Sequence, residues 1–389
     1  MSDTQKNKKP NVPNLRFPGF EGEWEKLTLG EISEYRKERI ATSDLSTEIY
    51  VSTENMLPGY GGIAPASNIP ESNNVSAFYP GDILVSNIRP YLKKVWHARQ
   101  HGGCSSDVLV IKPEKKVLDS FLYFNLANDS FITYAMTGAK GVKMPRGDKE
   151  QLMKYELALP SISEQKKIAS LLLLIDQRIA IQNKVIEDLK KLKTAIGERI
   201  FKLVQGKQIS LGDILNERNE KSIKNNQYEV LSSTVTGIYS QREYFNKDIA
   251  SANNSGYKIV HQGDIVMSPQ NLWMGNINYN DRFERGIVSP SYKVFSIRKA
   301  FDERYVAFLV KTKKALWEYS LVSEQGASIV RRNLNYESFL EISFQIPSYN
   351  EQKEVGEMIA AVNSKLLLEQ KLLLSLSRQK SYFLSNIFI

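Results

Sequence analysis

One stretch of the chain occurs twice, and each copy opens a long helical pattern. The first copy is Leu-Pro-Ser-Ile-Ser-Glu-Gln-Lys-Lys-Ile at residues 159–168, and the second is Ile-Pro-Ser-Tyr-Asn-Glu-Gln-Lys-Glu-Val at residues 346–355. In each copy a serine three residues before a glutamate predicts a capping box, in which each side chain accepts a hydrogen bond from the other residue's backbone N–H. The preceding proline disfavours an earlier helix start. We therefore expect two long helices with the same local start.

Apolar residues follow each start at alternating steps of four and three, which predicts a seam against another helix. Both copies are interrupted at the same position, by Gln182 and by Glu369. A helix over residues 163–205 would be roughly 64 Å long, so an antiparallel coiled coil that acts as a spacer is favoured over two core helices of one globule. The predicted seam consists of Ile168, Leu172, Ile175, Ile179, Ile186, Leu189, Val355, Ile359, Val362, Leu366, Leu373 and Leu376.

The repeat extends beyond the helices. Gly-Asp before a run of apolar residues occurs at Gly81 and again at Gly263, and predicts a turn that leads into a buried strand. Residues 107–110 and 291–294 predict a further strand in each half, and residues 121–124 and 305–308 predict a short helix. The loops between these elements differ, as expected of one scaffold that carries two binding specificities.

These patterns predict an α+β protein with an internal pseudo-two-fold repeat. Two mixed α/β domains would be separated by two long helices that form an antiparallel coiled coil, the simplest way to bury both seams within one chain. The predicted segments are a flexible N-terminal tail at residues 1–14, a first globular domain at 15–160, a first long helix at 161–205, a second globular domain at 206–347 and a second long helix at 348–389.

Composition limits the partners and the compartment. The chain has 52 Lys and Arg against 43 Asp and Glu, which favours a polyanionic partner such as double-stranded DNA. The one cysteine, Cys104, excludes an internal disulfide and fits a reducing compartment. No apolar run approaches about 18 residues, and the start of the chain lacks the apolar core of a signal peptide. We expect a cytoplasmic protein that does not enter a membrane.

Sequence motifs of catalysis are absent. The sequence contains no Asn-Pro-Pro-Tyr tetrapeptide for a flipped adenine, no G-x-x-x-x-G-K-[ST] phosphate loop and no nucleophile elbow. The glycine cluster at residues 59–62 predicts a turn, and His97, His101 and Cys104 lack the spacing of a metal site. We expect a chain that is not an enzyme by itself and that binds neither a metal nor a cofactor.

Polar and basic residues follow the two Gly-Asp strands and the later glycines at residues 138 and 326. Arg pairs well with guanine and Asn or Gln with adenine, whereas Lys more often contacts phosphate. The alternative for each residue alone is a solvated surface charge. The candidate DNA contacts are Asn87, Arg89, Tyr91, Lys93, Lys94, Lys140, Lys143 and Arg146 in the first domain, and Ser268, Gln270, Asn271, Trp273, Arg331 and Arg332 in the second.

The faces of the helices carry two further signals. Lysines in the first helix indicate a solvated face, with contact to a duplex as the alternative; they are Lys184, Lys190, Lys191 and Lys193. Leucines off the seam make both helices apolar over a wider arc than a two-stranded pair requires, which predicts a docking surface; they are Leu171, Leu173, Leu174, Leu367 and Leu368.

The combined pattern resembles the specificity (S) subunits of type I restriction-modification systems. The resemblance covers residues 15–389 and rests on Phe-Pro-Gly-Phe at 17–20 with Glu23 and Trp24, on the two Gly-Asp-Ile strands, on the two Pro-x-x-x-Glu-Gln-Lys helix openings and on the alternation of domains and helices. It implies that the two domains are target recognition domains, each of which reads one half of a bipartite DNA sequence in the major groove.

The resemblance also implies partners. The paired helices would set the gap between the half-sites and dock two modification subunits, which are adenine-N6 methyltransferases that use S-adenosylmethionine. Two restriction subunits, which are translocases with nuclease activity that depend on ATP and Mg, can join that complex. The cofactors would therefore belong to the partner subunits.

Two other functions stay open on the residues alone. A coiled-coil scaffold whose domains bind proteins would have the same helices, but it would show little salt-sensitive binding to duplex DNA. A self-sufficient methyltransferase or nuclease lacks its motifs here, and binding of S-adenosylmethionine by the isolated chain would favour it.

Overall fold

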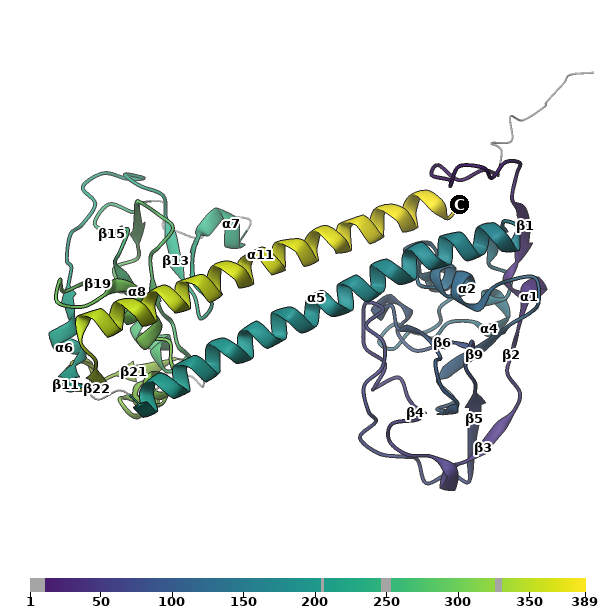
Figure 1. Ribbon diagram of the computed structural model, residues 1–389, viewed down its shortest axis with the longest axis horizontal. Coiled ribbons are helices and arrows are strands. Elements are labelled where there is room, and N and C mark those ends of the chain that lie inside the picture. The colour runs from purple at the N-terminus through teal and green to yellow at the C-terminus, as the bar shows by residue number, and fades with distance from the viewer. Residues whose placement is uncertain (1–10, 204–205, 246–252, 326–330) are drawn as a thin grey trace, which may run out of the picture. The chain divides into compact units, whose positions relative to one another are not determined.

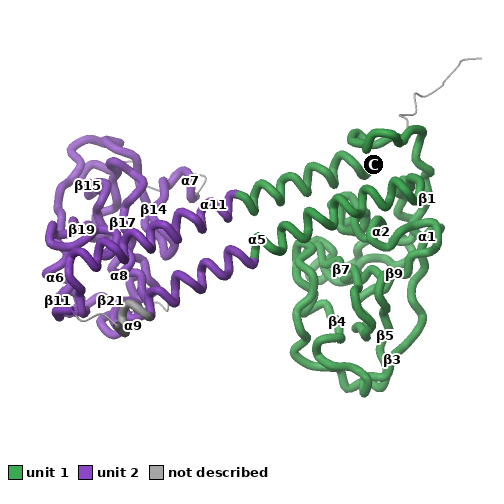
Figure 2. The backbone as a smooth tube through the Cα atoms, viewed as in Figure 1, with its two compact units in different colours: residues 1–183, 372–389 green, residues 184–371 purple. Residues whose placement is uncertain are grey.

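The computed structural model describes residues 11–203, 206–245, 253–325 and 331–389 (Figure 1). Most of the predicted N-terminal tail and the predicted loop at Gly326 lie outside the described residues. The chain forms two compact units (Figure 2). The first comprises the described residues up to Asn183 together with Leu372–Ile389, and the second is Lys184–Lys371. Each unit thus contains part of both long helices, and the predicted division into five functional segments stays a prediction.

The first unit contains two four-stranded sheets and one strand pair. One sheet is antiparallel and has the order β2 (Ser33–Tyr35), β9 (Val108–Pro113), β6 (Ile83–Ser86) and β7 (Val95–His97). The other has the order β3 (Arg39–Ala41), β5 (Asn74–Phe78), β8 (Gly102–Cys104) and β4 (Tyr50–Val51), and the pair joins β1 (Glu25–Thr28) to β10 (Glu156–Leu159). The short helices are α1 (Leu29–Ile32), η1 (Thr42–Asp44), η2 (Pro90–Leu92), α2 (Asp119–Leu126), α3 (Asp129–Thr137) and α4 (Lys149–Leu152).

The second unit repeats this framework. Its four-stranded antiparallel sheet has the order β12 (Leu215–Glu217), β19 (Lys293–Ile297), β16 (Ile265–Met267) and β17 (Ile277–Tyr279). Its strand pairs are β11 (Lys207–Ser210) with β22 (Ser343–Ile346), β15 (Lys258–His261) with β18 (Arg285–Val288), β13 (Leu231–Ser233) with β14 (Ile238–Ser240), and β20 (Ser323–Gln325) with β21 (Arg332–Leu334). The short helices are α6 (Leu211–Ile214), α7 (Gln241–Phe245), η3 (Pro269–Met274), α8 (Glu303–Leu309), α9 (Lys313–Leu321) and α10 (Tyr336–Glu341).

The order of elements confirms the predicted α+β class and the internal repeat. The sheet β2-β9-β6-β7 has the same strand order as β12-β19-β16-β17, and β1-β10 corresponds to β11-β22. Helices α2 and α3 follow β9 as α8 and α9 follow β19. The described elements that differ are those between the shared ones: β3 and β4 widen a sheet in the first unit, whereas the second unit has the hairpins β13-β14 and β20-β21.

The repeated Gly-Asp pairs build equivalent turns before β6 and β16. Gly81 and Gly263 have φ angles of 92° and 90°, a left-handed conformation that glycine adopts without steric cost. The buried carboxylate of Asp82 accepts hydrogen bonds from the Arg36 guanidinium at 2.6 and 2.8 Å. In the second unit Asp264 pairs with Arg218 at 3.0 Å. In each unit the aspartate therefore ties the Gly-Asp turn to the arginine that directly follows β2 or β12.

The long helices are α5 (Ile162–Leu203) and α11 (Tyr349–Ile387). At the start of α11 the Glu351 carboxylate accepts from the backbone N–H and the hydroxyl of Ser348, at 2.9 and 2.7 Å. At the start of α5 the predicted capping box is wrong for Glu164. Its carboxylate instead accepts from Arg16 at 2.8 and 2.9 Å, because a nearly buried guanidinium offers two charge-assisted hydrogen bonds that the cap cannot match.

In the first unit, the start of α5 and the end of α11 pack antiparallel. Ile168 and Leu172 share one apolar core with Ile387, and Lys380 pairs with Asp176 at 2.6 Å. Every residue of the predicted seam is buried or half-buried. Among the described residues, no helix combines the length and the apolar character needed to cross a lipid bilayer.

Candidate nucleic-acid interface

In the first unit, two segments after β6 and α3 form one surface, here called loop surface 1 and defined as residues 87–94 and 138–148. Asn87 bonds through its carbonyl to the N–H of Gly147 at 3.0 Å, and the N–H of Arg89 bonds to the carbonyl of Pro145 at 2.8 Å. Lys140 and Arg146 exchange two backbone hydrogen bonds at 2.9 Å. The structure therefore brings together the two candidate groups that the sequence places about 50 residues apart.

Loop surface 1 has an unusual backbone. Arg89 and Lys93 flank η2 and have φ angles of 50° and 56°, so two of the four described non-glycine residues with positive φ lie here. Left-handed backbone at a side chain with a Cβ costs of the order of 1 kcal/mol per residue, and it persists only where the surroundings impose it. The strain marks these positions as candidates for a function that needs this loop shape.

Most cations of loop surface 1 have acceptors within the unit. Lys93 pairs with Asp129 at 2.7 Å, and Lys94 donates to the carbonyl of Thr53 at 2.6 Å. The other two ion pairs join Lys140 to Asp148 and Arg146 to Asp107, both at 3.2 Å.

These partners were missed at the sequence level, because acidic residues in other loops give no local signal. Hydrogen bonds from the Gln151 N–H and from Lys140 lower the pKa of Asp148, so its carboxylate stays charged beside the surface. Lys143 and Tyr91 are exposed.

Two buried polar atoms of loop surface 1 have no hydrogen-bond partner in the described part of the chain. They are Oδ1 of Asn87 and Nε of Arg89. A Cβ added at Gly147 would lie 2.9 Å from Asn87 Oδ1, so the glycine leaves room for that amide. A buried polar atom without a partner costs about 1–3 kcal/mol, and an external ligand can supply the missing partner.

The second unit has the equivalent surface, here called loop surface 2 and defined as residues 268–274 with 323–325 and 331–334. The Arg332 guanidinium lies over the Trp273 ring at 4.1 Å, and β21 packs against η3. Oδ1 of Asn271, Nε of Arg332 and Oγ of Ser323 are buried without a hydrogen-bond partner among the described residues.

The sequence did not indicate Ser323, because its burial depends on the β20-β21 hairpin. Gln270 and Arg331 are exposed, whereas Ser268 is half-buried before η3.

The residues weighed as metal ligands do not gather. His97 pairs with Asp119 at 3.2 Å and stacks on Tyr123, whereas Cys104 lies buried in another core. Burial raises the pKa of the Cys104 thiol to about 12. Across residues 11–203, 206–245, 253–325 and 331–389, no three His, Cys, Asp or Glu side chains form a group that could hold a metal ion.

The chain is similar to known specificity subunits of type I restriction enzymes. Residues 21–191 match the family model of the type I restriction modification DNA specificity domain. The chain is 22% identical over 397 residues to the type I restriction enzyme MjaVIII specificity subunit of Methanocaldococcus jannaschii, a match that spans 92% of this chain and 89% of the relative. Residues 21–191 thus match a type I specificity domain, and the chain is similar to a type I specificity subunit over most of its length.

The chain has two further similarities. It is 25% identical over 167 residues to the EcoDI specificity subunit of Escherichia coli, a match that spans 42% of this chain and 37% of the relative. The crystal structure of an S subunit from M. genitalium has a TM-score of 0.63 at 16% identity, with 97% of this chain and 99% of that chain covered. At this identity the structural likeness shows the fold.

Within this chain the two loop surfaces occupy equivalent places in the repeat. Each begins where a central strand of the sheet ends, at Asn87 after β6 and at Ser268 after β16. Each also includes a later segment, which lies between α3 and α4 in the first unit and between α9 and α10 in the second. The strands and helices around the two surfaces correspond, whereas the side chains that the two surfaces present differ.

Proposed function

We propose that this chain is a specificity (S) subunit that reads a bipartite DNA sequence, with loop surface 1 on one half-site and loop surface 2 on the other. The observation that carries the proposal is the set of buried polar atoms left without partners. Of the nine such atoms in the described part of the chain, four belong to residues that the sequence nominated as DNA contacts. They are Asn87, Arg89, Asn271 and Arg332.

The chemistry of these four residues suits base edges. An asparagine amide pairs with N6 and N7 of adenine, and an arginine guanidinium with O6 and N7 of guanine. Each surface contributes one residue of each type, at positions where the backbone or the packing holds the side chain in place. Such preorganisation reduces the entropy that binding would otherwise cost.

The differences between the surfaces favour two different half-sites. Loop surface 1 presents a basic hairpin around Lys143, whereas loop surface 2 presents an arginine stacked on Trp273. A bulky ring and a lysine-rich hairpin cannot make the same contacts in a groove. The target would therefore be asymmetric.

The long helices would set the gap between the half-sites and dock two modification subunits. The support is a set of large apolar side chains that α5 and α11 expose away from the seam, since exposed apolar surface of this kind marks protein-binding sites. They include Leu174, Ile181, Leu367, Leu368 and Leu374. In this proposal the chain performs no chemistry itself; S-adenosylmethionine is bound by the modification subunits, and ATP and Mg by restriction subunits that join them.

The test is genome-wide adenine methylation in cells that express this chain with a compatible modification subunit. We expect a new motif of two short sequences around a fixed gap. Arg89→Ala should relax the sequence of one half-site and Arg332→Ala that of the other, by roughly 1–3 kcal/mol per lost base contact. A complex that assembles and binds S-adenosylmethionine but methylates no bipartite motif contradicts the proposal.

The matched control is Arg298→Ala, an exposed arginine of the second unit outside both loop surfaces. Its motif should equal that of the unsubstituted chain. Relaxation of both half-sites by a single substitution in one loop surface would contradict the assignment of one half-site to each unit.

A further inference from the structure

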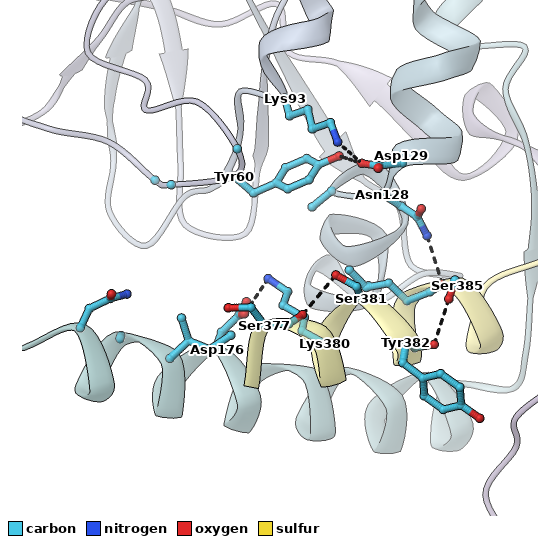
Figure 3. A pocket seen from close by; sticks show the side chains of 18 residues that line it. Tyr60, Lys93, Asn128, Asp129, Asp176, Ser377, Lys380, Ser381, Tyr382 and Ser385 are labelled. Carbon is cyan, nitrogen blue, oxygen red and sulfur yellow. Dashed lines mark hydrogen bonds and ion pairs between the residues drawn. The ribbon is translucent and has the colours of Figure 1, made fainter. Parts of the chain in front are cut away.

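Each unit contains a hollow beside its loop surface. The first hollow has a volume of about 920 Å³ and is lined by the glycine turn at 59–62, by Lys93 and residues 127–129, and by parts of α5 and α11 (Figure 3). The second hollow has a volume of about 400 Å³ and lies between residues 193–198 of α5 and residues 308–314. The first hollow lies wholly within the first unit, and the second lies wholly within the second unit.

The two hollows are the same site of the internal repeat. With the helix offset of 187 residues, Lys193 and Thr194 of the second hollow correspond to Lys380 and Ser381 of the first. The ring beside Lys380 is Phe124 at 5.8 Å, and the corresponding ring in the second hollow is Phe308. A Cβ at Gly197 would lie 2.8 Å from that ring, so α5 approaches α8 closely there.

Their charges differ. In the first hollow, Lys93 pairs with Asp129 and Lys380 pairs with Asp176, at 2.7 and 2.6 Å (Figure 3). In the second unit the positions of the two aspartates are taken by Lys313 and Asn363. The second hollow is instead lined by four lysines and one carboxylate, which are Lys193, Lys311, Lys313, Lys314 and Glu198.

The lysines of the second hollow lack enough anionic partners. Among the described residues, the acceptors of the Lys311 ammonium are all neutral: the carbonyls of Val235 and Gly275 at 2.9 and 2.8 Å and Oδ1 of Asn278 at 3.0 Å. Burial of that ammonium, and then the charge of Lys193, lower the pKa of Lys311 to about 8.

Two further lysines add to this excess of positive charge. Lys313 pairs with Glu198 at 3.1 Å, and both Lys313 and Lys314 stand in the first turn of α9, where positive charge opposes the helix dipole. A bound anion would relieve each of these unfavourable interactions.

The second hollow adjoins loop surface 2. Gly275, whose carbonyl accepts from Lys311, follows η3 directly, and α9 packs against η3. We propose that the second hollow binds a phosphate group of the DNA backbone beside the half-site that loop surface 2 reads, and that the charge-balanced first hollow does not. This inference rests on the proposed function.

A DNA phosphate fits these observations better than an acidic segment of a protein. Lysines contact phosphate and fix the register of a protein on a duplex without reading sequence. The sugar-phosphate backbone that flanks a half-site must also pass over a site that is continuous with the surface that reads the bases. The two units would then hold their half-sites with different strengths of ionic contact.

The test is the salt dependence of binding of the full chain to a duplex, because each phosphate contact adds about 0.9 to the slope of log K against log salt. Lys193→Gln with Lys314→Gln should reduce that slope by about one. Lys224→Gln with Lys299→Gln, two exposed lysines of the same unit outside the hollow, removes the same charge and should leave the slope nearly unchanged.

A slope unaffected by the hollow substitutions overturns the inference, and so does loss of modification subunits from the complex with an unchanged slope. If the double variant does not fold, Glu198→Gln provides the test. Removal of that carboxylate should strengthen binding to the duplex several-fold at moderate salt. An unchanged affinity for the duplex would refute the site. Salt-insensitive binding by the unsubstituted chain would instead refute the proposed function.

Discussion

At the scale of single residues, a buried glutamine in each copy of the helix-opening motif explains why the motif occurs twice. Gln165 is fully buried; its amide donates to the carbonyl of Pro160 at 2.9 Å, and its oxygen accepts from the N–H of Leu118 at 2.8 Å. Gln352 bonds in the same way to Pro347 and Asp302, both at 3.0 Å. The glutamine therefore ties the start of each long helix to the segment that precedes α2 or α8.

Gln165→Ala should destabilise the first unit by roughly 1–3 kcal/mol, because it leaves buried backbone groups without partners. Chemical denaturation of the full chain measures the change. Gln177→Ala on the exposed face of α5 is the matched control and should change stability by less than about 0.5 kcal/mol. Equal effects of the two substitutions would contradict the role assigned to Gln165.

Sequence reasoning located the residues of this motif but not their partners. It recognised the spacing of serine and glutamate, because caps are local, yet Glu164 bonds to Arg16, 148 positions earlier in the chain. It likewise found Asp82 as part of a turn without finding Arg36. Partners brought close by tertiary folding leave no periodic signal, and for that reason the acidic neighbours of loop surface 1 were also missed.

At the scale of elements, periodicity predicted the long helices well and the loops poorly. The spacing of four and three gives a seam in which every residue is at least half-buried, and the predicted helix over 161–205 runs from Ile162 to Leu203. The interrupting polar residues, Gln182 and Glu369, are buried within it. By contrast, β3, β4 and the hairpins β13-β14 and β20-β21 are short, and their sequences are dominated by turns.

The exposed leucines of α11 provide a test at this scale. Leu367→Asp with Leu368→Asp should abolish co-purification with modification subunits while the chain stays folded, because these side chains are 53% and 60% exposed and contribute little to its own core. Ser364→Asp with Gln370→Asp adds the same charge at exposed polar positions of α11 and should retain the complex. A normal complex from the leucine variant would refute the docking surface.

At the scale of the whole molecule, the compact units differ from a simple alternation of domains and helices. Each unit takes in a segment of both long helices, and residues 372–389 complete the first unit although they end the chain. Ile387 lies in the core of that unit, and Phe388 packs on Phe121 with ring centroids 5.4 Å apart. The sequence pattern predicted antiparallel helices, but it could not predict which core the last two turns would join.

Removal of residues 372–389 should therefore destabilise the first unit and leave the second folded. The tryptophans allow the units to be followed separately, since Trp24 and Trp96 lie in the first, and Trp273 and Trp317 in the second. Variants that retain the tryptophans of only one unit should show a lowered unfolding midpoint for the first unit alone. A parallel loss in both units, or in neither, would contradict this division of the core.

The place of those last residues also sets an order of events during synthesis. Residues up to 183 leave the ribosome early, but the core of the first unit lacks Ile387 until about 200 further residues have been made. At 5–20 residues per second, the interval after residue 183 lasts on the order of 10 to 40 s. During that time the exposed core of the first unit is open to chaperones and proteases, so a chain cut short by premature termination is left with an unfinished first half.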